Sequence, residues 1–222
     1  MKRLIIIVEG ETEESFVNNV LSPYFNSRGL YNMVQCFKIK HSHGGISKYS
    51  HVKTDILNAL YENDAVVSTM IDFYRLPSDF PGFNEIQGID VKIKKVTYIE
   101  DCVKKEIESC QGRRFDNLIP YIQLHEFEAL IFSSVDGVSE LFDKREYDSG
   151  RFSKIVGSYP NPEDINDGPD TAPSMRLKKI IPGYDKVLFG VEMVKSIGMD
   201  TLLLKCPHFA YWVNNLLSSL KN

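Results

Sequence analysis

Short apolar runs alternate with amphipathic segments over the first 133 residues. The first run, Leu4–Val8, is rich in β-branched residues and predicts a strand buried on both faces. Further strands are predicted over 33–40, 65–71 and 118–124, and helices over 13–21, 47–61 and part of 89–110, the last of which a strand over 94–99 could divide. This alternation predicts an α/β fold with a doubly wound, Rossmann-like parallel sheet flanked by helices.

The pattern changes after residue 133. Residues 157–173 are rich in Pro, Asn, Asp and Gly and are predicted as loop. Helices are predicted over 174–181, 187–197 and 207–220. We therefore expect an α/β domain over 1–133 and, over 134–222, a loop and helical C-terminal elaboration packed on the same domain.

Composition and charge narrow the class of protein. Hydrophobic residues make up 43% of the 222 residues, enough for a globular core. The net charge of −4 argues against a wholly basic surface but permits a local basic groove. The cysteines form no C-x-x-C pair, which predicts reduced thiols in a cytoplasmic protein. The start is typical of a strand rather than a signal peptide, and no run approaches the roughly 20 apolar residues of a membrane span.

Acidic residues follow three of the predicted strands. Glu9 follows the first, Asp72 follows the third, and Glu126 and Glu128 follow the fourth. The carboxyl ends of parallel strands meet at one edge of a sheet, where α/β proteins bind ligands. Carboxylate oxygens are the ligands that Mg²⁺ and Mn²⁺ prefer, so these ends predict a metal site.

The turn after the first strand adds a second acid. Glu13 lies four residues after Glu9, so both carboxylates can face one crevice. Thr12 is expected to cap the helix that begins there. The alternative is that Glu11, Glu13 and Glu14 only favour the positive N-terminus of that helix.

Basic and glycine-rich segments offer weaker candidates. Arg176, Lys178 and Lys179 could neutralise phosphates of a nucleic acid, although a solvated helix face is the default. Gly44-Gly45, after His41 and His43, could cradle a phosphate through free amides or form a plain turn.

The string Val8-Glu9-Gly10-Glu11-Thr12-Glu13 resembles the first motif of Toprim domains, most closely the V-E-G-x-T-E form of OLD-type (overcoming lysogenization defect) nucleases. Ile71-Asp72 after a hydrophobic strand resembles their second acidic motif. The whole chain, including the strings 121–130 (YIQLHEFEAL) and 205–209 (KCPHF), also resembles a bacterial Toprim-like family catalogued as a domain of unknown function.

The resemblance implies roles for the acids. Glu9 would be a general acid/base or metal ligand, Glu13 a second ligand and Asp72 the first aspartate of the second motif. Glu126 and Glu128 would stand at a later acidic motif, Glu126 nearer the strand end. The chain departs from the D-x-D pattern because Tyr74 replaces the second acid, for which Asp79 could compensate.

Two hypotheses follow from this resemblance. The first is a Mg²⁺- or Mn²⁺-dependent nuclease of Toprim type, with Glu9 and Asp72 as catalytic residues. The second is a catalytically degenerate module that partners a separate ABC-type ATPase in a bacterial anti-phage or mobile-element system. A phosphatase or nucleotide hydrolase using the same acids is a weaker third. Nucleic acid is the expected partner, and an oligomer is compatible with the sequence.

Overall fold

A parallel sheet forms the centre of the first part of the chain. The computed structural model describes residues 2–31, 33–40, 45–165, 168 and 170–221. The strands are β1 (Arg3–Val8), β2 (Val34–Lys38), β3 (Ala65–Asp72), β4 (Leu118–Ile119) and β5 (Ile122–Gln123). Their order is β2-β1-β3-β4, all neighbours are parallel, and β5 pairs with the carboxyl end of β3. The predicted α/β fold with a parallel sheet is confirmed.

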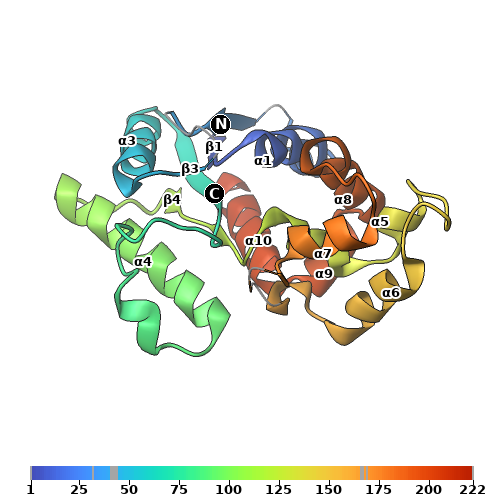
Figure 1. Ribbon diagram of the computed structural model, residues 1–222. Helices are drawn as coiled ribbons and strands as arrows, with labels where there is room; N and C mark the ends of the chain where they lie inside the picture. The colour runs from blue at the N-terminus through green and yellow to red at the C-terminus, as the bar shows by residue number, and fades with distance from the viewer. Residues whose placement is uncertain (1, 32, 41–44, 166–167, 169, 222) are drawn as a thin grey trace. The chain divides into compact units, whose positions relative to one another are not determined.

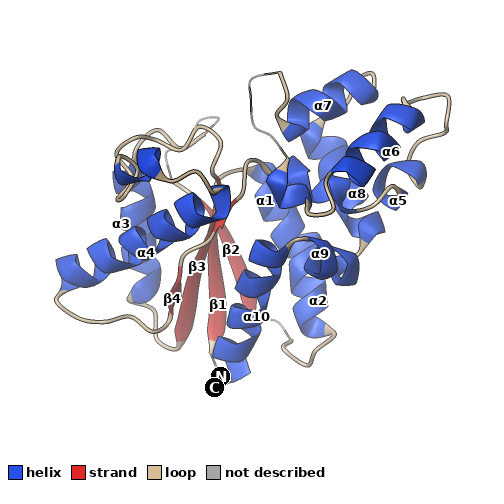
Figure 2. Ribbon diagram, turned by 90° about the horizontal axis from the view of Figure 1, so that it is seen from below, coloured by secondary structure: helices blue, strands red, loops and turns tan. Residues whose placement is uncertain are grey.

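Helices cover both faces of this sheet. They are α1 (Glu11–Phe16), the π-helical turn η1 (Val17–Leu21), α2 (Ser22–Asn26), α3 (Tyr49–Leu60), the 3₁₀ turn η2 (Glu85–Gly88) and α4 (Lys92–Gln111). Figure 2 shows α3 and α4 on one side of the strands and α1 and α2 on the other. Right-handed crossovers explain this, because the connection from β1 to β2 and the connection from β2 to β3 run in opposite directions across the sheet.

Two contact-defined units account for the described chain. The first contains Met1–Gln123 and Trp212–Asn222, and the second contains Leu124–Tyr211. The helix α10 (Pro207–Lys221) contributes residues to both units. The predicted domain division between residues 133 and 134 stays a prediction.

The regular elements of the described part of the second unit are all helical. Its elements are η3 (Phe127–Ser133), α5 (Asp136–Ser139), α6 (Ser149–Ser158), η4 (Pro162–Asp164), α7 (Pro173–Ile180), η5 (Lys186–Gly190), α8 (Val191–Ile197), α9 (Met199–Lys205) and the start of α10 (Figure 1). The predicted helices over 174–181, 187–197 and 207–220 are confirmed, and α6 and α9 are additional. Among the described residues, no helix has the length and apolar character needed to cross a membrane.

Three local predictions are wrong. The α4 helix runs unbroken, so no strand divides it over 94–99. Thr12 does not cap α1, because the helix begins at Glu11 and Gly10 occupies the cap position without a side-chain hydrogen bond. The predicted strand over 118–124 is divided into β4 and β5 because Pro120 has no amide hydrogen to donate to a ladder.

Side chains of β3 replace the hydrogen bonds lost at this break. The Thr69 hydroxyl donates to the Tyr121 carbonyl and accepts from the Tyr121 amide, both at 2.9 Å. The Ser68 hydroxyl accepts from the indole nitrogen of Trp212 at 2.8 Å. The Tyr121 ring stacks on Trp212, with ring centroids 4.3 Å apart. These contacts attach the last part of α10 to the sheet.

Candidate functional site

Glu9 and Asp72 lie together at the carboxyl edge of the sheet. Val8 is in register with Met70, and the Glu9 amide continues the ladder by donating to the Met70 carbonyl at 3.3 Å. The Oε2 atom of Glu9 accepts a hydrogen bond from the Asp72 amide at 3.2 Å. Glu9 is half-buried, and Asp72 is only 8% exposed. The two predicted catalytic residues are therefore neighbours on adjacent strands.

Glu13 lies on the first turn of α1, and its side chain is buried. Its Oε2 atom would be 3.2 Å from a β-carbon at position 10, so a glycine lets this carboxylate fold back toward the strand end. Gly45, with φ of +137°, lies over Glu9, whose Oε1 would be 3.7 Å from a β-carbon there. His41, His43 and Gly44 lie outside the described residues.

The donor set of this edge suits a hard cation. Mg²⁺ in enzymes is held by one or two carboxylates together with waters and substrate phosphates, rather than by a cage of protein ligands. Within the described part of the chain, no group of three or more His, Cys, Asp or Glu side chains is arranged to hold a metal ion. Glu9 and Asp72, with Glu13 nearby, therefore form at most an open, partial ligand set, and the metal site stays a prediction.

The loop after β3 does not supply the missing acid. Asp79 accepts the Tyr49 amide through both carboxylate oxygens, at 3.1 and 3.0 Å, and so stabilises the N-terminus of α3. The hypothesis that Asp79 compensates for Tyr74 is therefore wrong in this structure. The Tyr74 ring lies beneath the Arg75 guanidinium, which is 5.3 Å from the ring centroid.

Gln123 is a polar neighbour of the site that the sequence reasoning missed. It is in register with Asp72, and its carbonyl accepts the Phe73 amide at 2.9 Å. The Tyr121 hydroxyl donates to its side-chain oxygen at 2.6 Å, and Gln123 is fully buried. A glutamine inside the run 118–124 was the available signal, since polar side chains are seldom buried without a specific partner.

Glu126 and Glu128 belong to the second unit, where both are buried. Glu126 accepts the Ser174 amide at 3.0 Å, in the first turn of α7. Glu128 is only 1% exposed and lies 3.5 Å from the Lys186 ammonium. These contacts give each carboxylate a role inside the second unit, and their predicted role as metal ligands stays a prediction.

Tyr184 and His125 are two further buried polar residues of the second unit. Burial raises the pKa of the Tyr184 hydroxyl far above its ordinary range, and the nearby Glu128 carboxylate adds to the shift. His125 is fully buried and has a φ of +67°, an uncommon backbone conformation for a residue with a β-carbon. The chain therefore enters the second unit through a bend at Leu124 and His125, followed by the buried acids Glu126 and Glu128.

The predicted basic residues lie on α7, and two of them contact the preceding loop. Arg176 donates to the Thr171 carbonyl at 2.6 Å, and its guanidinium lies 5.6 Å from the centroid of the Tyr159 ring. Lys179 donates to the Asp170 carbonyl at 2.8 Å. Lys178 is exposed and has no ion pair among the described residues. Nucleic-acid binding by these residues stays a prediction.

Comparison with known proteins places the chain in a family. No curated protein and no solved structure matches it. The model of DUF4276, a domain of unknown function, matches residues 8–217. The expected resemblance to a domain family of unknown function is confirmed, while the relationship to Toprim domains stays a prediction. The match spans nearly the whole chain, which therefore belongs to the DUF4276 family.

Proposed function

We propose that this protein hydrolyses phosphodiester bonds as a Mg²⁺- or Mn²⁺-dependent nuclease of Toprim type. The observation that carries the proposal is the hydrogen bond of 3.2 Å between Glu9 Oε2 and the Asp72 amide, which puts two acidic residues from adjacent strands at one sheet edge. The V-E-G-x-T-E string around Glu9 supports the same assignment. We also propose that the protein is a component of a bacterial anti-phage or mobile-element system.

Glu9, Glu13 and Asp72 are the residues that would hold the metal ion. When bound, such an ion activates water and stabilises the leaving oxygen of a phosphodiester. The Asp72 amide orients the Glu9 carboxylate, and burial of Glu13 and Asp72 strengthens their electrostatic interactions. These three acids would repel an anionic substrate, so a cation has to lie between the carboxylates and the phosphate.

Substitution of Glu9 tests the proposal. Glu9→Gln keeps the shape of the side chain and removes its charge, so we expect metal-dependent cleavage of DNA or RNA to fall at least about a hundredfold, the scale of losing a positioned catalytic group. Isothermal titration should show Mn²⁺ binding to the wild type and much weaker binding to the variant. Glu11→Gln is the matched control, because Glu11 is an exposed acid only two residues after Glu9.

If Glu9→Gln and Glu11→Gln both cleave as well as the wild type, the assignment is contradicted. Free nucleotides belong in the same assay, because a phosphatase would act on them and leave DNA and RNA intact. Candidate ATPase partners should be added as well, so that an activity that waits for a partner is detected.

A second candidate is a non-catalytic module that partners a separate ABC-type ATPase. Tyr74 favours it, because an acid is expected at this position of the second motif and Asp79 contacts the N-terminus of α3 instead. This candidate predicts no Mn²⁺ binding to the wild type, with or without nucleic acid.

A further inference from the structure

An open groove runs along the outer edge of β2. Its volume is about 510 Å³, within the roughly 300–1,000 Å³ of small-ligand sites. Among the described residues, β2 pairs only with β1, so its other edge faces the groove. The lining residues come from β1, α1, β2, α3 and the short segments just after β2 and α3, all in the first unit: Ile7, Glu14, Cys36, Phe37, Lys38, Lys40, Asp55, Asn58, Ala59 and Glu62.

An aromatic ring is available in this groove. Phe37 is 50% exposed, although it belongs to a strand whose neighbour β1 is almost fully buried. The other uncharged walls are Ile7, Ala59 and Cys36. Burial, with the nearby Glu14 and Glu13 carboxylates, raises the pKa of the Cys36 thiol to about 12, so this side chain is neutral at physiological pH. The groove therefore presents an aromatic ring next to uncharged side chains, and charged side chains complete its lining.

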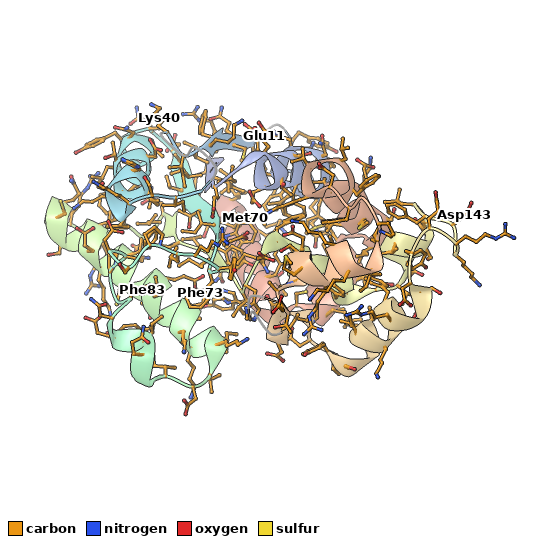
Figure 3. All side chains as sticks on the ribbon, viewed as in Figure 1. Glu11, Lys40, Met70, Phe73, Phe83 and Asp143 are labelled. Carbon is orange, nitrogen blue, oxygen red and sulfur yellow. The ribbon has the colours of Figure 1, made fainter. Side chains whose placement is uncertain are left out.

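The acidic residues of the lining already have partners. Glu14 lies 3.4 Å from the Lys38 ammonium, and Glu62 lies 2.8 Å from the Arg3 guanidinium. Asp55 accepts the Lys40 amide at 2.9 Å. The Lys40 ammonium, by contrast, has no carboxylate partner among the described residues and is exposed at the surface beside α3 (Figure 3). An anionic group can thus approach Lys40 at this rim.

The basic end of the groove adjoins the candidate catalytic edge. Lys38 is in register with Val8, the residue before Glu9, and Lys40 follows two residues later. Both lysines therefore lie at the carboxyl end of the sheet, as Glu9 and Asp72 do. A nucleic acid with one phosphodiester at Glu9 would be able to place a neighbouring nucleotide in the groove.

We propose that this groove binds one unpaired nucleotide of a single-stranded nucleic acid. The base stacks on Phe37, the exposed Asn58 amide contacts the base edge, and Lys40 contacts a phosphate. Stacking on an aromatic side chain requires a base that is not enclosed in a duplex. The assignment rests on the proposed nuclease function for its biological meaning, and it narrows the substrate class to single strands or loops.

Anisotropy of a short labelled oligonucleotide, measured in EDTA, tests the groove separately from catalysis. Phe37→Leu keeps an apolar side chain but removes the ring, and we expect about tenfold weaker binding of single-stranded DNA or RNA, given that one stacked base contributes roughly 1–3 kcal/mol. Phe37→Tyr should bind like the wild type. Lys40→Ala should weaken binding and reduce its salt dependence. Tyr31→Leu, an exposed aromatic outside the lining, is the control.

The outcomes separate the two proposals. The wild type should bind single strands in EDTA, because the groove does not need the metal site. A wild type that does not bind single strands, equal binding of duplex, or no effect of Phe37→Leu would overturn the groove assignment even if cleavage is found. If the groove instead bound an extended peptide at the β2 edge, Phe37→Leu would not change the binding of the oligonucleotide. Loss of binding in Phe37→Leu with full binding in Phe37→Tyr supports the assignment even if cleavage is absent.

Discussion

The Glu163 carboxylate shows how burial and hydrogen bonding compete at one residue. It is only 1% exposed and accepts the amides of His208 at 2.9 Å and Phe209 at 3.0 Å, in the first turn of α10. Burial raises its pKa, and the two amides together with the His208 side chain lower it by a smaller amount. The net effect is a raised pKa, so the folded protein binds this proton more tightly than the unfolded chain.

This raised pKa predicts the direction of a pH effect on stability. Below the ordinary Glu pKa of about 4.3, both states are protonated and Glu163 adds no pH dependence. As the pH rises from there through the raised folded pKa, the unfolded chain releases its proton first, so the free energy of unfolding falls. Denaturant unfolding at a series of pH values should show this fall in the wild type and not in Glu163→Gln. An equal fall in both proteins would assign it to other groups.

The residues of the candidate site differ in how far the sequence predicts them. Glu9 and Asp72 were predictable because an acid directly after a buried strand has a fixed place, at the carboxyl edge of a parallel sheet. Gln123 was not, because its position beside Asp72 depends on the register of β5 against β3, which the apolar run over 118–124 does not reveal. Asp79 was misjudged because nothing in a loop sequence indicates which helix N-terminus it reaches.

At the scale of elements, the interrupted strand gives a direct test. Thr69 lies in the middle of β3 and supplies both hydrogen bonds to the Tyr121 backbone. Thr69→Val keeps the shape and removes both bonds, and each lost bond to a buried group costs about 1–3 kcal/mol. We expect the free energy of unfolding to fall by at least about 2 kcal/mol. Thr69→Ser retains the hydroxyl and should lose clearly less; equal losses would show that packing of the methyl group dominates.

Most elements of the sheet unit follow from local patterns, and the exceptions have local causes. The apolar runs predicted β1 and β3 because these central strands are buried on both faces, whereas β2 is a partly exposed edge strand. The helix after β1 contains a π-helical turn just before α2, where Pro23 has no amide to donate to the Asn19 carbonyl four residues earlier. A hydrophobic pattern of helical period does not reveal such a local change of hydrogen bonding.

At the scale of the whole molecule, the chain leaves the sheet unit after Gln123 and returns to it at Trp212. The return occurs within α10, whose apolar pattern continues without interruption across Tyr211 and Trp212. The sequence pattern changes near residue 134, where alternating strands and helices give way to loops and helices. Tertiary contacts, however, decide which residues belong to one unit. A boundary inside a continuous helix therefore leaves no compositional signal.

Trp212 makes the metal proposal measurable in the intact protein. It is the only tryptophan of the chain, and its stacking on Tyr121 and hydrogen bond to Ser68 place it in the unit that contains Glu9, Glu13 and Asp72. Its fluorescence thus reports unfolding of that unit. A ligand that binds only the folded state stabilises it by about 2.7 kcal/mol at a hundredfold excess over its dissociation constant.

Mn²⁺ should therefore raise the midpoint of the Trp212-detected denaturant transition in the wild type and in Glu11→Gln, with a dependence on the logarithm of its concentration. Glu9→Gln should show little or no shift, since it lacks a charged carboxylate at the end of β1. Equal shifts in all three proteins would place the ion elsewhere on the molecule. Because thermodynamic linkage requires no turnover, this measurement tests for the cation without any substrate, and a wild type that shows no shift favours the non-catalytic module over the nuclease.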